Sequence, residues 1–151
     1  MVIVKWAFFL IIALALSVLV LFAYKGHQSR AGSIPGLQQG LLQSCPDKPN
    51  CVSSEHGEDA QHSIEALRLS ESVSVKELTE AVRSLGGMVV KTDEFYLAAT
   101  FTSTVFGFVD DLELRHEGGG VWQVRSASRV GHSDLGVNRK RVEALRASLQ
   151  P

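Results

Sequence analysis

The sequence predicts an α+β domain, an antiparallel sheet with helices packed on one face in the order β-α-β-β-β-α, preceded by one N-terminal transmembrane helix. The helix is indicated by the uneven spread of hydrophobic residues, which make up 22 of residues 1–24 but only 46 of the other 127. The domain is indicated by consecutive strand-like segments and two helical segments, without a repeated strand–helix crossover. The 151 residues are enough for an anchor and one domain but too few for several domains.

Residues 1–24 form the predicted anchor, and residues 6–24 are its membrane-spanning part. Ser17 is the only polar residue in this run, which Lys5 and Lys25 flank. At about 1.5 Å per residue the run spans roughly 28 Å, close to the ~30 Å hydrocarbon core of a bilayer. A cleavable signal peptide has a shorter apolar core and a small-x-small cleavage site. The sequence therefore favours a retained anchor in contact with the lipid bilayer.

The side of the membrane on which the domain lies is indicated by two opposing observations. Lys5 precedes the run and Lys25 and Arg30 follow it, so the positive-inside rule taken alone places the domain in the cytoplasm. A disulfide between Cys45 and Cys51 would instead require an oxidising compartment. We expect a single-pass protein of the inner (plasma) membrane with its domain on the periplasmic or extracytoplasmic side.

Residues 25–44 are rich in Gly and Gln and show no sustained hydrophobic period. This composition predicts a flexible tether, and the α+β domain then occupies residues 45–151.

The first half of the domain contains one strand, one helix and one short segment. Residues 64–69 are a plausible strand. Ser74 and Glu77 form a capping box, and apolar residues continue at helical spacing to Gly86. Residues 88–92 are β-branched and short, and a turn at Asp93 and Glu94 follows.

The second half contains three strands and a closing helix. Residues 95–104 alternate, and residues 106–116 place Leu112 and Leu114 on one face with Glu113 and Arg115 on the other. A glycine turn at 118–120 leads to a strand over 121–129. Residues 139–149 form a helix with one apolar stripe.

Cys45 and Cys51 are separated by a turn-forming stretch with two prolines and an asparagine. A structural disulfide is the favoured interpretation, and it would contribute about 2 kcal/mol by closing a small loop. A zinc site with His56 and His62, a redox or nucleophilic cysteine, and free thiols are the alternatives. The five-residue spacing is wider than most zinc motifs, and the Cys-x-x-Cys pattern of redox pairs is absent. We expect neither a metal nor a cofactor.

Residues 125–141 carry the candidate ligand-binding side chains, Arg125, Arg129, His132 and Arg139. Strand alternation places Arg125 and Arg129 on one face, and a loop with His132 precedes a helix whose expected N-cap is Asn138. Three cations, at 139–141, then lie in the first turn of that helix, where its dipole disfavours positive charge. Either the neighbouring acids at 110–111 or an anionic ligand would offset them.

Two other chemical interpretations, one of residues 132–134 and one of residues 110–111, are weaker. His132, Ser133 and Asp134 are the residue types of a catalytic triad, but neighbours in sequence cannot form its line of contacts. Asp110 and Asp111 point to opposite faces of a strand, so they cannot chelate one cation together. We expect one of them to face solvent and the other to pair with an arginine.

The charge balance argues against nucleic-acid binding. Residues 31–151 contain 12 basic and 16 acidic residues, whereas a nucleic-acid-binding domain presents a basic face.

Three segments resemble the domain-of-unknown-function family numbered fourteen-ninety-nine. They are 45–54, which begins Cys-Pro-x-x-Pro-Asn-Cys-Val-Ser-Ser, the stretch 107–111, and the long segment 125–139. The resemblance covers roughly residues 45–149. It implies export or membrane attachment, and it implies no reaction, ligand or catalytic residue.

Three hypotheses of function follow. The first is a non-enzymatic, membrane-tethered envelope module that binds a protein partner or an anionic small ligand through residues 125–141. The second is an enzyme acting on an anionic envelope substrate, with His132 as acid/base and Arg125, Arg129 and Arg139 as a clamp. In the third, the polar segment is an internal salt-bridge network that closes the fold.

Overall fold

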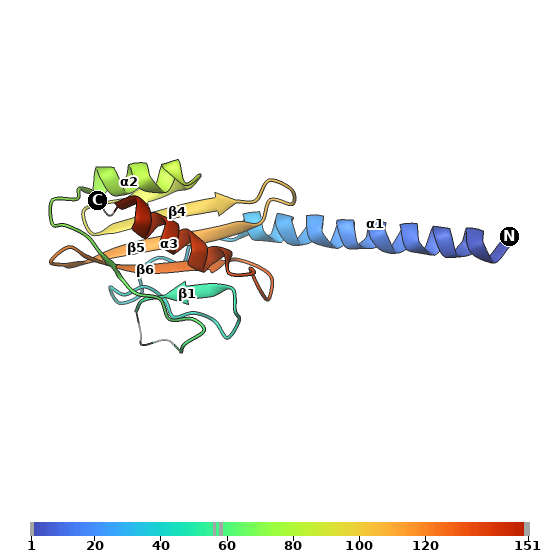
Figure 1. Ribbon diagram of the computed structural model, residues 1–151, viewed down its shortest axis with the longest axis horizontal. Helices are drawn as coiled ribbons and strands as arrows, with labels where there is room; N and C mark the ends of the chain where they lie inside the picture. The colour runs from blue at the N-terminus through green and yellow to red at the C-terminus, as the bar shows by residue number, and fades with distance from the viewer. Residues whose placement is uncertain (1, 56, 58, 150–151) are drawn as a thin grey trace.

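A long helix, α1 (Val2–Ala31), projects from an α+β domain (Figure 1). The computed structural model describes residues 2–55, 57 and 59–149. After α1 the elements follow in the order β1 (Cys51–Ser53), β2 (Leu67–Arg68), α2 (Val75–Ser84), β3 (Met88–Thr92), β4 (Tyr96–Thr102), β5 (Val109–Gly118), β6 (Val121–Ser128) and α3 (Val137–Leu149).

The strands form one antiparallel sheet, as predicted, in the order β1-β6-β5-β4-β3, and β2 also pairs with β6. Two strands are additional to the predicted order. β3 is the short β-branched segment, and it lies at the sheet edge. β1 has only three residues, all of them buried, so it shows no alternation from which a strand could be predicted.

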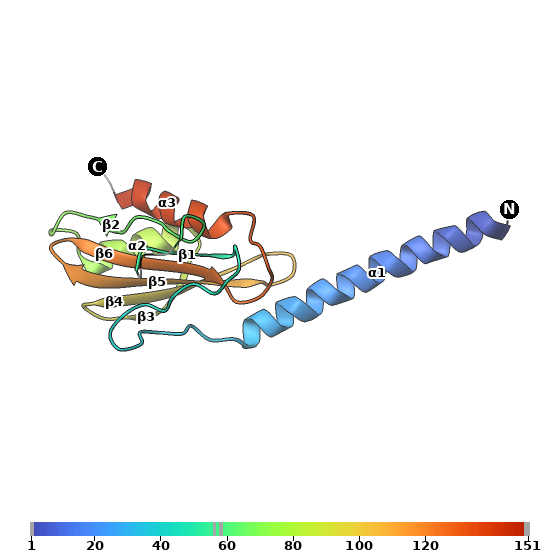
Figure 2. The same ribbon diagram turned by 90° about the horizontal axis from the view of Figure 1, so that it is seen from below.

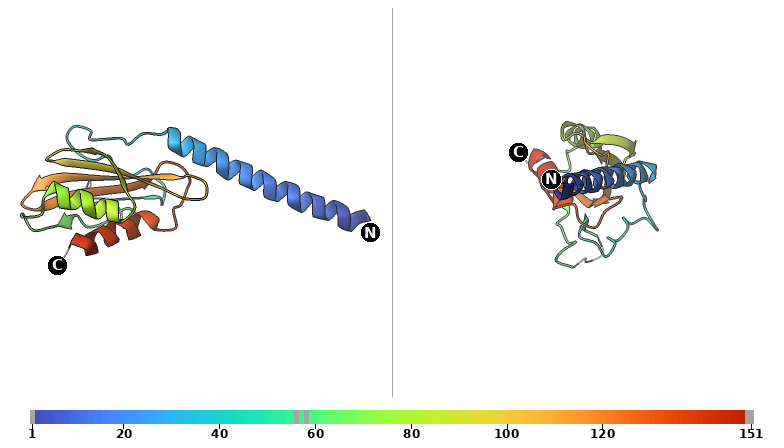
Figure 3. Two further views of the ribbon diagram at one scale, coloured as in Figure 1. Left: turned by 90° about the horizontal axis from the view of Figure 1, so that it is seen from above. Right: turned by 90° about the vertical axis from the view of Figure 1, so that its right-hand side faces the viewer.

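Helices α2 and α3 cover one face of the sheet (Figure 3), and the main hydrophobic core lies between these helices and the sheet. Leu112 and Leu114 of β5 point into this core, as their alternation predicted. The other members are mostly aliphatic: Val52, Ile64, Leu67, Leu78, Val82, Leu97, Ala99, Trp122, Val124, Val142 and Leu145. The predicted capping box is present, because Ser74 Oγ accepts the Glu77 N–H and the Glu77 carboxylate accepts the Ser74 N–H.

By length and composition, α1 is able to cross a membrane. Within Val4–Ala31 the most apolar 18-residue window has a mean hydropathy of 2.8, and this window is not buried within the protein. A helix that is apolar all round and uncovered is typical of a segment surrounded by lipid.

The residues expected to form a tether, 25–44, do not hang free of the domain. Helix α1 continues to Ala31, and the chain then runs along the sheet face opposite α2 and α3 (Figure 2). Ile34 and Leu42 pack there against Tyr96 and Ala98. This stretch is held against the sheet by that small apolar cluster and by backbone N–H groups that donate to carboxylates.

Candidate functional site

The sheet face under residues 32–45 carries six charged side chains and one tyrosine, here called the ionic layer. β4, β5 and β6 run side by side, so their alternate residues gather on this face. The ionic layer consists of Glu55, Tyr96, Asp111, Glu113, Arg115, Arg125 and Arg129. It contains two of the four predicted ligand-binding residues, Arg125 and Arg129.

Arg129 binds Asp111 in a bidentate arrangement and also holds the end of α1. Its Nε lies 3.0 Å from both carboxylate oxygens of Asp111, and its Nη2 lies 2.8 Å from Oδ1. Its Nη1 donates to the carbonyl oxygens of Ser29 and Gly32. An arginine at the C-terminus of a helix satisfies carbonyls that lack partners within the helix.

Glu113 is a fully buried carboxylate at the centre of the ionic layer. It accepts hydrogen bonds from the Tyr96 hydroxyl at 2.6 Å and the Gly36 N–H at 3.0 Å, and Arg125 Nη1 lies 3.3 Å away. Burial raises the pKa of Glu113 above 4.5, although these partners act in the opposite direction. Burial and the adjacent carboxylate also raise the pKa of Tyr96.

Glu55 closes the other end of the ionic layer. It forms an ion pair with Arg115, and its second oxygen accepts the Leu42 N–H at 2.7 Å. The segment over the sheet is therefore held by backbone hydrogen bonds to two buried carboxylates, Glu55 and Glu113.

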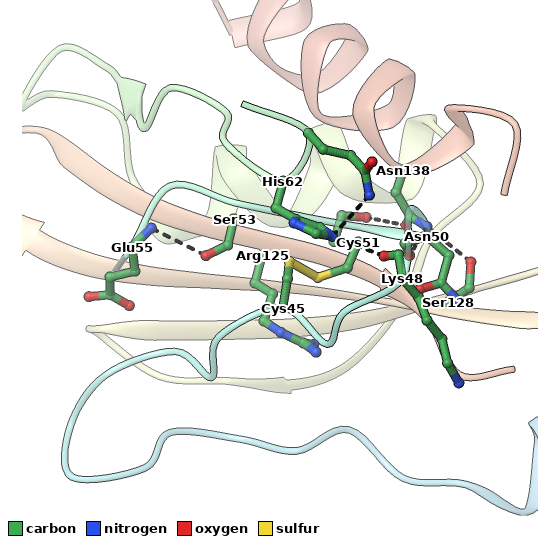
Figure 4. The surroundings of a disulfide bond; sticks show 12 residues. Cys45, Lys48, Asn50, Cys51, Ser53, Glu55, His62, Arg125, Ser128 and Asn138 are labelled. Atoms are coloured by element: carbon green, nitrogen blue, oxygen red, sulfur yellow. Dashed lines mark hydrogen bonds between the residues drawn. A yellow bond between two sulfur atoms is a disulfide. The ribbon is translucent and has the colours of Figure 1, made fainter. Parts of the chain in front are cut away.

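The predicted disulfide is present between Cys45 and Cys51 (Figure 4). It lies where the segment over the sheet meets β1, and Figure 4 draws Arg125 among the surrounding residues. His62 is buried nearby, with Nε2 3.1 Å from the Lys48 carbonyl oxygen and Nδ1 2.9 Å from Asp59. The described residues contain no cluster of three or more metal-ligand side chains. His56, the other proposed zinc ligand, lies outside the described residues.

Asn138 is not the N-cap of α3; it lies one residue inside the helix and is buried. Its amide donates to Asn50 O, Ser128 Oγ and Asp134 Oδ2, and its oxygen accepts from Ser126 Oγ. The carboxylate of Asp134 accepts the Asn138 N–H. Asp134 lies in the loop before α3 and thus supplies negative charge at the start of the helix.

Both neighbouring aspartates form ion pairs, one on each face of β5. Asp111 binds Arg129 in the ionic layer, whereas Asp110 binds Arg141 of α3 at 2.7 Å on the helix side. The expectation that one of them would face solvent is therefore wrong. Arg141 also lies over the Phe101 ring, so the protein itself holds one of the three first-turn cations.

The four predicted ligand-binding residues are not brought together. Arg125 and Arg129 are covered by the segment over the sheet. His132 is exposed in the loop after β6, and Arg139 donates to the Gln61 carbonyl oxygen. Arg125, Arg129 and Arg139 are close in sequence but not in space, because the sheet lies between the ionic layer and α3.

A half-open pocket of about 490 Å³ is a candidate site that was not predicted. Its wall is an aromatic stack in which His116 lies between Phe95 and Trp122, with centroid distances of 6.2 and 4.7 Å. Glu71 and Glu94 also line it. His116 and Trp122 are direct partners across the β5–β6 hairpin, so pairing these strands around the glycine turn would have indicated this stack.

The comparisons with known proteins identify a family and no further relative. A family model described as "Protein of unknown function (DUF1499)" matches residues 41–149. No curated protein and no solved structure matches the chain.

Proposed function

The chain belongs to the DUF1499 family of proteins of unknown function, and on that basis we propose that it is a single-pass membrane protein of the cell envelope. Its domain lies outside the cytoplasm and acts as a non-enzymatic binding module for a protein partner. The observation that carries this proposal is that the two ends of the domain differ. The apolar helix α1 leaves one end, and the β5–β6 turn lies at the other (Figure 1). The residues of that turn line the aromatic pocket.

The anchor is supported by the surface of α1. Its side chains from Val4 to Phe22 are largely apolar and exposed. The side of the membrane is supported by the disulfide, since such bonds persist in oxidising compartments and are rare in the cytosol. The charges that flank the helix favour the opposite side by one residue only, and the disulfide is the stronger argument.

A binding site at the pocket is supported by what the pocket offers. Phe95 is 56% exposed beside the His116–Trp122 stack, and two carboxylates stand at the rim. Aromatic faces combined with carboxylates suit a cationic or planar side chain of a protein partner. The pocket faces the aqueous compartment because it lies away from α1.

An enzyme built on His132 has less support. The proposed clamp needs Arg125 and Arg129 beside the imidazole, but both guanidinium groups are bound to carboxylates of the ionic layer. An anionic substrate at His132 would therefore lack two of its three arginines.

A C-terminal reporter that is active only outside the cytoplasm tests the location. We expect activity in the full-length fusion, and we expect Cys45 and Cys51 to be oxidised in protein isolated from membranes. A silent reporter together with reduced thiols would overturn the extracytoplasmic location.

Affinity capture from detergent-solubilised membranes tests the binding site. We expect a partner that is recovered with the wild type and lost with Phe95→Ala and Glu94→Gln. Met88→Ala is the matched control, because Met88 is exposed on the edge strand β3 and does not line the pocket. Equal recovery with all variants would exclude the pocket as the binding site.

A further inference from the structure

We propose that the end of the domain beside α1 is a lipid-contacting surface, formed by the loops 103–108 and 129–136 and occupied by membrane phospholipid. The inference rests on the proposed insertion of α1 and goes beyond it, because it places part of the folded domain in the bilayer interface. In Figures 1 and 2 both loops reach along α1 past its C-terminal end.

Aromatic contacts with α1 determine where the first loop lies along the axis of that helix, and hence its depth in the membrane. The Phe22 ring lies 5.2 Å from the Phe106 ring and 6.1 Å from the Phe108 ring. Phe22 is two residues inside the end of the apolar run at Tyr24, or about 3 Å along the helix. If the run spans the hydrocarbon core, Phe106 and Phe108 lie at the level of its last turn.

Glycines and hydrogen bonds hold this loop against the helix. A Cβ at Gly26 would lie 1.8 Å from the Phe106 carbonyl oxygen, so only glycine permits this approach. Arg30 donates to the carbonyl oxygens of Phe106 and Gly107. The loop therefore follows α1 to the membrane, and Val105 at its tip is 79% exposed.

The second loop exposes a leucine in an unfavourable backbone conformation. Leu135 has a φ of 56° and is 86% exposed, so an apolar side chain is displayed where asparagine or glycine is the usual choice. Strained residues cluster where they serve a function. Contact with lipid in the membrane accounts for the exposed apolar side chain.

A cleft of about 310 Å³ connects the helix and both loops. Phe22, Phe108, Val130 and Val137 contribute apolar side chains to its lining. Because the cleft opens beside the last apolar turn of α1, it suits part of a phospholipid acyl chain.

The charges beside this surface agree with an anionic headgroup layer. Helix α3 begins directly after the second loop, and Arg139 and Lys140 lie in its first turn, where the helix dipole disfavours cations. Arg141 is already paired with Asp110. Arg139 donates to the Gln61 carbonyl oxygen, so headgroup phosphates would pair chiefly with the exposed Lys140.

The test measures the depth of single labelled cysteines in the full-length chain, whose native cysteines are joined in the disulfide. Val105→Cys and Leu135→Cys report on the surface, Leu14→Cys on α1, and Phe95→Cys on the opposite end of the domain. Each labelled variant is reconstituted in vesicles of phosphatidylcholine and phosphatidylglycerol that carry a nitroxide lipid quencher.

We expect quenching at positions 105 and 135 to be several-fold stronger than at position 95, and strongest at position 14. Leu135→Asn, which tolerates a left-handed backbone, should keep the domain folded and reduce quenching at position 105. If position 14 is quenched while 105 and 135 resemble 95, the lipid-contacting surface is overturned and the anchor stands. If position 14 is not quenched, the anchor fails and this inference fails with it.

Discussion

Glu113 shows how single residues determine the character of the polar sheet face. Its carboxylate is fully buried, and this burial carries a cost of desolvation. Three neighbouring groups bind the carboxylate and offset part of that cost. On the helix side, the buried amide of Asn138 joins α3 to Asn50, just before β1, and to Ser128 of β6. Both side chains are polar although they are buried, so burial alone would predict an apolar residue at either position.

Glu113→Gln should change how stability depends on pH. The folded-state pKa of Glu113 is raised, so the folded chain holds this proton more tightly than the unfolded chain. The resulting stabilisation is present below pH 4.5 and is lost as the pH rises through the raised value. The free energy of unfolding of the wild type minus that of the variant should therefore fall with pH.

Urea unfolding of the detergent-solubilised chain at a series of pH values measures this difference. The matched control is Glu80→Gln on the exposed side of α2, which shows the effect of losing a carboxylate elsewhere. A difference between wild type and Glu113→Gln that rises with pH would contradict the assignment.

Asn138→Asp should destabilise the domain by roughly 2–4 kcal/mol, because it replaces an amide donor with an acceptor that faces three other oxygens. Lys140→Ala, at an exposed position in the same turn, should cost less than about 0.5 kcal/mol. Chemical denaturation of both variants checks this, and equal stability of the two would refute the role of Asn138.

At the scale of elements, the segment 32–45 belongs to the folded domain. It overlaps the stretch 25–44, which the sequence predicts to be a tether because it is rich in glycine and glutamine. In the structure, the glycines at 36 and 40 adopt positive φ. These residues bend the chain around the ionic layer, and Leu42 is 1% exposed at the end of the segment. A composition that is typical of a flexible linker here belongs to an irregular stretch of chain that tertiary contacts hold in place.

Leu42→Ala should cost about 2–4 kcal/mol, because it leaves a cavity beside Tyr96 and Ala98. Leu41→Ala provides a neighbouring control: Leu41 is 41% exposed, and its truncation should cost less than about 1 kcal/mol. The midpoint of urea unfolding compares the two variants. Equal midpoints would mean that the segment is a tether in solution.

At the scale of the whole molecule, α1 and the domain are joined by more than the chain itself. Ser29 Oγ accepts the Val109 N–H at 2.8 Å, and Arg129 binds the last carbonyls of the helix. A helix docked in this way fixes which end of the domain faces the membrane. With α1 inserted as proposed, the domain has a membrane side and an aqueous side.

Gly26→Ala should separate α1 from the β4–β5 loop, because the added Cβ would collide with the Phe106 carbonyl oxygen. We expect the Val109 amide to exchange its hydrogen at least about tenfold faster, which corresponds to roughly 1.4 kcal/mol of lost protection. His27→Ala changes the adjacent exposed position and serves as the control. Unchanged exchange at Val109 in Gly26→Ala would show that the docking is not needed.

The sequence by itself determined the elements whose signals are local. The apolar run of α1, the capping box of α2, the alternation of β4 to β6 and the turn between the cysteines each depend on neighbouring residues. They therefore predicted the α+β class, the antiparallel sheet and the disulfide. The three-residue β1 has too short a pattern for such a prediction.

Only the tertiary structure decided how the charged side chains are used. Arg125 and Arg129 are predicted ligand-binding residues, and strand pairing places them beside Glu113 and Asp111 under a covering segment. His116 and Trp122 carried no motif, and the hairpin register joins them in a pocket wall. Ion pairs and stacks depend on which distant residues become neighbours, and the pairing of strands and docking of α1 determine this.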